Sequence, residues 1–332
     1  MAANLFPYKE CHLESGPAKP VTAIMKFNVS APSLKALQWI VFNPAPPELP
    51  QQRLSDVKIR IDNSTSAAQY IKELSPERRY LLRSLVPATN EKLFKNINMR
   101  TTYLLSCSGR ELKAGAPKVP PEPLTDAARK MYTAPSETVN FNSPEFRAWL
   151  QANHLVKTTG ERDIEFAWRV FSRIRKQYSY NYDSKQDRHI SVLCGKDSTD
   201  CGGLSWLLVG ALRANGIPAR SLIGRRLKKD AEPDSANNGF GQCHVKSEFY
   251  ANGIGWVPME MSGAVSSKTA DPMNFFGKVD SNFVVLHTDT DLMLDTVWFG
   301  ISTQRNLQQP AFWVTGEGTV NGYTAQITWQ TQ

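Results

Sequence analysis

The segment STDCGGLSWLLVGALRANGIPAR, residues 198–220, limits what this chain can fold into more than any other stretch. It places Cys201 and two glycines directly before a strongly apolar helix. The N–H groups at a helix N-terminus carry about half a positive charge, which stabilises a thiolate. Because glycine has no side chain, Gly202 and Gly203 leave the backbone open to a substrate carbonyl. The segment predicts a nucleophilic cysteine, with the N–H of Gly202 as a candidate oxyanion donor.

Two helices are predicted in the later part of the chain. The helix that begins at Cys201 ends near Gly216, which suits the left-handed residue after a helix, and Pro218 forbids its continuation. A second helix is expected over residues 161–177, where helical spacing puts four apolar residues on one face: Ile164, Trp168, Phe171 and Ile174. Strand-like alternation follows these helices, so this part is expected to be an α+β domain with helices packed on an antiparallel sheet.

The first third of the chain is predicted to be a β-sandwich. Four segments have the period-two or continuous apolar pattern of strands: 25–29, 37–43, 57–61 and 96–104. Turn signals separate them, as in a sandwich. The proline-rich segment GAPKVPPEPLT, residues 115–125, reads as a stiff linker. The sequence therefore predicts an N-terminal β-sandwich domain over residues 1–122 and a second domain over residues 123–332.

A base for the cysteine is predicted in a hairpin, residues 244–262. Strands 244–250 and 254–260 would be joined by a three-residue loop with Gly253 in the left-handed conformation. That register puts His244 opposite Glu260, with Cβ atoms about 5 Å apart. Glu260 would then hold one imidazole nitrogen and leave the other for Cys201, as in the triads of thiol and serine hydrolases.

Residues 160–300 resemble the transglutaminase-like core, a branch of the papain-like thiol enzymes. The resemblance rests on the Cys201 helix with its RANGIPAR exit, on the His244 hairpin and on NFFGKVDSNFVVLHTDTDLML, residues 274–294. It implies that Cys201 is the nucleophile, His244 the base and position 260 the acid, although the family usually has aspartate where this chain has Glu260. Tyr180 matches an aromatic position before the nucleophile, where it would either help hold the oxyanion or pack. Many bacterial relatives also carry an N-terminal sandwich.

The resemblance implies acyl transfer through a thioester on Cys201. We expect an amine acceptor and amide-bond formation, with a protein, a peptide or an acidic acyl-carrier protein as donor, as in the natural-product assembly of some bacterial relatives. The net charge of +8 favours an acidic donor. The segment RRLKK contains four cations: Arg225, Arg226, Lys228 and Lys229. They would either steer the acidic donor to the cleft or form a solvated loop. No basic stripe with interleaved aromatics indicates nucleic acid.

Other functions remain open from the sequence. A thiol peptidase or amidase would use the same three residues and release the acyl group to water. A catalytically silent binding module is the second alternative. A zinc site is disfavoured, because the spacing of Cys194 and Cys201 is too wide and neighbours Cys243 and His244 point to opposite faces of a strand. The acidic residues at 230, 232 and 234 lack the pattern of a calcium loop. We expect no metal, cofactor or membrane partner, and a cytoplasmic location, since residues 1–16 lack a secretory signal.

Overall fold

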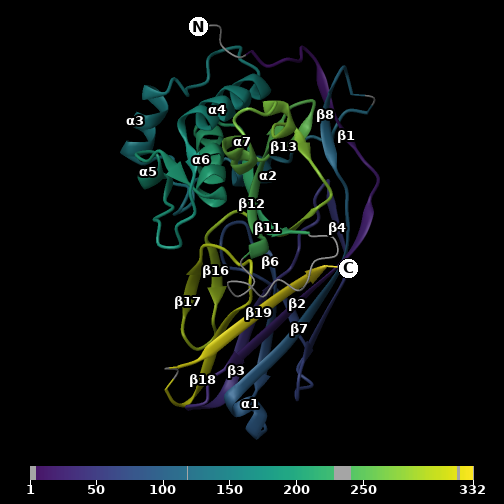
Figure 1. Cartoon of the computed structure of the whole chain (residues 1–332), viewed down its shortest axis with the longest axis vertical. Helices are drawn as coiled ribbons and strands as arrows, with labels where there is room; N and C mark the ends of the chain where they lie inside the picture. The colour runs from purple at the N-terminus through teal and green to yellow at the C-terminus, as the bar shows by residue number, and fades with distance from the viewer. Residues whose placement is uncertain (1–4, 118, 228–240, 320–321, 332) are drawn as a thin grey trace.

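The computed structural model of the protein describes residues 5–117, 119–227, 241–319 and 322–331. Two antiparallel four-stranded sheets form a β-sandwich at the bottom of Figure 1, with the strand orders β18-β3-β6-β5 and β19-β2-β7-β4. The strands span Lys19–Ser30 (β2), Leu34–Pro44 (β3), Gln52–Ile61 (β4), Gln69–Lys72 (β5), Tyr80–Pro87 (β6), Asn96–Cys107 (β7), Ala311–Gly318 (β18) and Thr324–Thr331 (β19). All four strands predicted from the sequence lie within this sandwich.

The predicted boundary between the two domains is wrong at the C-terminal end. β18 pairs with β3, and β19 pairs with β2 over eight residues, so the end of the chain completes both sandwich sheets. Ile327 and Trp329 of β19 are buried in the sandwich core beside Phe27 and Met99. Strand pairing joins segments that are distant in the sequence, and the alternating pattern of a strand does not say which partner it will take.

The second body is built on the antiparallel sheet β13-β12-β11-β15, as the predicted α+β class requires. Its strands span Ala219–Arg226 (β11), Cys243–Ala251 (β12), Gly255–Met259 (β13) and Phe283–Thr288 (β15). The helices lie in the upper half of Figure 1 and span Asp126–Tyr132 (α2), Pro144–Ala152 (α3), Asp163–Gln177 (α4), Ile190–Leu193 (α5), Cys201–Ala214 (α6) and Met261–Ser266 (α7). Another short helix, α1, spans Glu91–Lys95 in the sandwich.

The remaining elements are short. The strands are Cys11–Ser15 (β1), Arg110–Ala114 (β8), Ser179–Tyr180 (β9), Ser198–Thr199 (β10), Lys278–Val279 (β14), Leu292–Asp295 (β16) and Ile301–Gln304 (β17), and a 3₁₀ turn covers Pro272–Asn274. The parallel pair β9–β10 sets Tyr180 beside Thr199. This pairing brings Tyr180 close to the start of α6.

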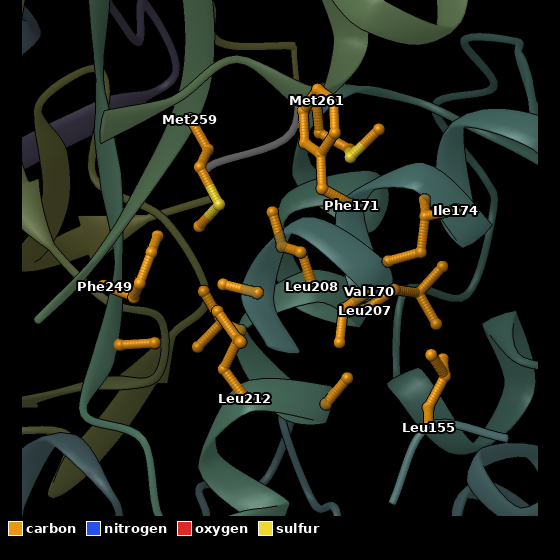
Figure 2. Packing of buried hydrophobic residues seen from close by; sticks show 14 of the residues in the cluster. Leu155, Val170, Phe171, Ile174, Leu207, Leu208, Leu212, Phe249, Met259 and Met261 are labelled. Carbon is orange, nitrogen blue, oxygen red and sulfur yellow. The ribbon is translucent and has the colours of Figure 1, made fainter. Parts of the chain in front are cut away.

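Helix α6 packs between α4 and the sheet (Figure 2). Leu207, Leu208 and Leu212 of α6 are fully buried, with Phe171 and Ile174 of α4 on one side and Phe249 of β12 on the other. All four residues of the predicted apolar face of α4 are buried. The apolar character of α6 therefore reflects burial on nearly every side, which fixes the position of its first residue.

Strand β15 belongs to the sheet of the second body and also packs against the sandwich. Val284 and Leu286 of β15 are buried in the sandwich core, and the side chain of Gln52 bonds both the N–H and the carbonyl of Val285, at 2.8 and 2.9 Å. Among the described residues, no helix is long and apolar enough to cross a bilayer.

Candidate active site

Cys201 is the first residue of α6, as the sequence predicts. Asp200 caps the helix, its carboxylate accepting a hydrogen bond from the N–H of Gly203 at 3.0 Å. At the other end Asn215 follows the last helical residue and Gly216 has a φ of +72°, the left-handed conformation expected of it. Ser205, one turn after Cys201, hydrogen-bonds the carbonyl of Val245 at 3.4 Å. The sulfur of Cys201 therefore lies against β12, where the N–H of Val245 also bonds it.

Gly203, the second glycine after Cys201, is required for packing. Both Gly202 and Gly203 are buried. A Cβ on Gly203 would lie 2.1 Å from Thr199 Oγ1 and 2.9 Å from Leu193 Cδ1, which no side chain tolerates. At Gly202 the nearest atom would be Cη2 of Trp206, at 3.3 Å. The prediction that the backbone is left bare is therefore corrected for Gly203, because neighbouring side chains fill the space there, and stays a prediction for Gly202.

The predicted acidification of the Cys201 thiol is also corrected. Although the residue is partly exposed, burial of the sulfur raises the pKa of Cys201 to about 12, and the nearby carboxylates of Asp200 and Glu260 act in the same direction. Hydrogen bonds from the N–H groups of Val245 and Gly202 lower the pKa but do not outweigh them. In this arrangement the helix terminus does not by itself make a thiolate, so a base is required.

His244 and Glu260 are in direct contact. His244 Nε2 lies 3.0 Å from Oε1 and 2.9 Å from Oε2 of Glu260, which leaves Nδ1 for another partner. The predicted register of the hairpin is wrong by two residues on one strand, since Ser247 faces Met259 and Ala251 faces Gly255 across a turn that contains Gly253. The contact survives because Glu260 lies beyond the end of β13, at the N-cap of α7, from where its side chain reaches His244.

Glu260 has several cationic or donating partners besides His244. Ser262 Oγ donates to it at 2.6 Å, and Lys246 Nζ lies at 3.5 Å. Burial raises its pKa, but His244 and Lys246 outweigh this and bring the pKa of Glu260 down to about 2. Glu260 is therefore a carboxylate around neutral pH. A fixed carboxylate on Nε2 is the arrangement that holds a catalytic imidazole in one tautomer.

The four predicted steering cations do not form one patch. Arg225 and Arg226 belong to β11, and neighbouring residues of a strand point to opposite faces. Arg225 is fully buried; its guanidinium donates to the carbonyl of Gln308 at 3.2 Å and lies over the ring of Trp329. A surface steering role for Arg225 is thus wrong. Lys228 and Lys229, like the acidic residues of 230–234, lie outside the described residues.

Arg226 is exposed and points toward His244. Its Nη2 atom lies 3.4 Å from Nδ1 and 3.2 Å from Nε2 of the imidazole. Tyr180 is half-exposed beside the same group of residues. Burial and the neighbouring Cys201 and Asp200 raise the pKa of Tyr180 to about 12, so its hydroxyl keeps its proton and can donate. The structure thus brings together Cys201, His244, Glu260, Tyr180 and Arg226.

One part of the site was not predicted. Arg188, in the loop before α5, binds the carboxylate of Asp200 with Nε at 2.8 Å and Nη2 at 2.6 Å. An aspartate directly before an apolar helix is a recognisable N-cap signal, so Asp200 could have been found from the sequence. Its arginine partner could not, because the loop that carries Arg188 has no periodic pattern.

Comparison with known proteins agrees with this geometry. The model of the transglutaminase-like superfamily matches residues 151–261, which span the nucleophile helix, the histidine strand and Glu260. Residues 151–261 are a transglutaminase-like domain. Members of this superfamily are generally cysteine-dependent enzymes, acyltransferases or proteases.

An uncharacterized protein of Haemophilus influenzae is 28% identical to this chain over 181 residues, which cover 45% of this chain and 48% of that protein. The chain therefore spans about half the length of the curated relative it matches. A proposed cysteine protease from Cytophaga hutchinsonii has a similar fold, with a TM-score of 0.53, 12% identity, and coverage of 96% of this chain and 100% of the other. The periplasmic domain of TgpA from Pseudomonas aeruginosa, bound to ethylmercury, covers 72% and 94% of the two chains at 12% identity, with a TM-score of 0.36.

Proposed function

We propose that this chain is a cysteine-dependent acyl-transfer enzyme that forms a thioester on Cys201. The observation that carries the proposal is the placement of His244, whose Nε2 is held by Glu260 while the adjacent residue, Val245, bonds the sulfur of Cys201 through its N–H. A base that is fixed by a carboxylate and borne beside the thiol is the requirement for nucleophilic catalysis by cysteine. Because the pKa of Cys201 is raised, proton transfer to His244 has to accompany attack.

The proposed chemistry has two balanced steps. In the first, the sulfur–carbon bond of the thioester forms as the bond from the acyl carbon to its leaving group breaks, and the proton of Cys201 passes through His244 to that leaving group. In the second, a bond forms from the acceptor to the acyl carbon as the carbon–sulfur bond breaks, and the proton of the acceptor passes through His244 to the released sulfur. The N–H groups of Gly202 and Val245 and the hydroxyl of Tyr180 are the nearby donors for the oxyanion.

An amine is the acceptor that we propose first, which makes the product an amide. The donor would be a peptide, a protein or an acyl-carrier thioester. Water is the second candidate acceptor, and the similarity of nearly the whole chain to a proposed cysteine protease favours it. The same triad serves both reactions, and the cytoplasmic location expected from the sequence stays a prediction.

Intact-protein mass spectrometry tests this proposal. The pure protein is mixed with acyl-carrier thioesters, glutamine peptides or an unfolded protein, each with and without an added amine. We expect an acyl adduct that C201S loses and that the matched variant C243S keeps, because Cys243 is adjacent to His244 in sequence but is not the proposed nucleophile. Amide formed in the presence of the amine would indicate acyl transfer, and free acid formed in its absence would indicate hydrolysis. Absence of an adduct and of turnover with every donor would contradict the proposal.

A further inference from the structure

Arg226 lies over the imidazole ring of His244. Its Nη2 atom is almost equally far from the two ring nitrogens, at 3.4 Å from Nδ1 and 3.2 Å from Nε2. An atom in the plane of the ring and equidistant from both nitrogens would collide with the carbon between them, so the guanidinium must sit above the ring face. Gly224 and His244 are paired across β11 and β12, and Arg226 follows Gly224 by two residues, so it projects to the same face of the sheet.

The guanidinium of Arg226 has no carboxylate partner within the described part of the chain, although two carboxylates lie nearby. Glu260 is engaged by His244, Lys246 and Ser262. Asp200 is engaged by Arg188 and by the N–H of Gly203. An exposed arginine beside a reactive centre, with no carboxylate partner among the described residues, is a ready receptor for an anion.

The position of Arg226 opposes catalysis unless the guanidinium moves. When Cys201 gives up its proton, His244 becomes a cation, and a second cation above the ring disfavours that state. No hydrogen bond joins the Cys201 sulfur to His244 among the residues described, so the pair is not yet engaged. Both observations indicate a resting arrangement of Arg226, His244 and Cys201. A bound ligand would have to move the guanidinium away from the imidazole before the thiol can react.

We infer that the acyl donor carries a carboxylate close to the carbonyl that Cys201 attacks, and that Arg226 binds it. This inference rests on the proposed function. Binding draws the guanidinium off the imidazole, which removes the charge that opposes protonation of His244. A carboxylate fits better than a phosphate dianion, because one arginine neutralises one charge and the carboxylates of Asp200 and Glu260 would repel a second. Arg226 is thus a specificity and positioning residue, in contact with the donor.

A pair of alkylating reagents tests this without knowledge of the natural donor. Iodoacetate and iodoacetamide have the same leaving group and similar size, but only iodoacetate carries a carboxylate. Their second-order rates with Cys201 are measured by mass spectrometry in the full chain, in R226Q, in R226K and in R60Q, a control at an exposed arginine of the sandwich. In R226Q we expect iodoacetate to react about tenfold more slowly, the loss of one charge-assisted bond, and iodoacetamide to react faster. R226K should partly restore the wild-type preference, and R60Q should not change it.

The opposite signs of the two changes are the decisive result. Damage to the site would slow both reagents together, and that outcome would overturn the inference. Equal rates in wild type and R226Q would overturn it too, while labelling of Cys201 in both proteins would leave the proposed function standing. If Cys201 reacts with neither reagent in the wild-type protein, both the inference and the proposed function fail.

Discussion

Arg188 binds the carboxylate of Asp200 with two nitrogens, at 2.8 and 2.6 Å, and Asp200 directly precedes Cys201. This carboxylate caps α6 but also raises the pKa of the neighbouring thiol. The same side chain thus stabilises the helix and disfavours ionisation of the Cys201 thiol. Arg188 offsets part of the negative charge without removing it.

The first prediction concerns D200N. Asparagine caps a helix as well as aspartate does, so the fold should persist. Removal of the negative charge lowers the pKa of Cys201, so the thiolate fraction rises at any fixed pH. The pH curve for alkylation by iodoacetamide should move down by about 1 unit. D271N, a change at another capping aspartate, is the control and should leave the curve in place. An unmoved curve in D200N would show that Asp200 does not act on the thiol.

The second prediction concerns the contact between Glu260 and His244. In E260Q the amide cannot balance the imidazolium or fix its tautomer, so turnover should fall by about 10²- to 10⁴-fold while the fold is kept. E260D should be much milder, because it keeps the charge. Near-normal turnover by E260Q, measured with whichever donor gives an adduct, would mean that another residue orients His244.

Glu260 also makes a pH-dependent contribution to stability. Its folded-state pKa is about 2, below the ordinary value of 4.5, so ionised Glu260 stabilises the fold above about pH 4.5 and the contribution is lost as the pH falls toward 2. Urea titrations of wild type and E260Q should therefore differ most at neutral pH, by up to about 3 kcal/mol, and converge in acid. A gap that stays constant from pH 6 to pH 3 would contradict this.

The third prediction compares two neighbouring glycines. Alanine gains about 1 kcal/mol of helix propensity at either position. In G203A the added methyl would meet Thr199 Oγ1 at 2.1 Å, so overpacking should cost about 1–3 kcal/mol net of that gain. In G202A the closest atom is the edge of Trp206, at 3.3 Å, and the loss should be small. Equal stability of the two variants in urea would show that Gly203 is not needed for packing.

The fourth prediction concerns the N-terminal sandwich. The fragment 1–122 lacks β18 and β19, which form an edge of each sheet, and lacks the buried Trp329. Expressed alone, it should not unfold cooperatively in urea, whereas the full chain should. A cooperative, monomeric fragment 1–122 would show that the C-terminal strands are dispensable for the sandwich.

Local periodicity and end signals were sufficient for much of this protein. The apolar faces of α4 and α6, the glycine that ends α6 and the strands of the sandwich each depend on residues that are close in the sequence. Cys201 and His244 could be singled out for the same reason, since a helix start and a hairpin are local features. The resemblance to transglutaminase-like motifs added the expectation that Cys201 and His244 belong to one site, as nucleophile and base.

The tertiary structure alone decided what surrounds those residues. Arg225 and Arg226 look equivalent in the sequence, yet the alternation of β11 buries one against the sandwich and places the other over His244. Glu260 reaches His244 from the start of α7 and not from the predicted strand register. The pKa of Cys201 depends on how far burial and two carboxylates outweigh two N–H groups. Such balances are set by distances between segments that are far apart in the chain, and no local pattern encodes them.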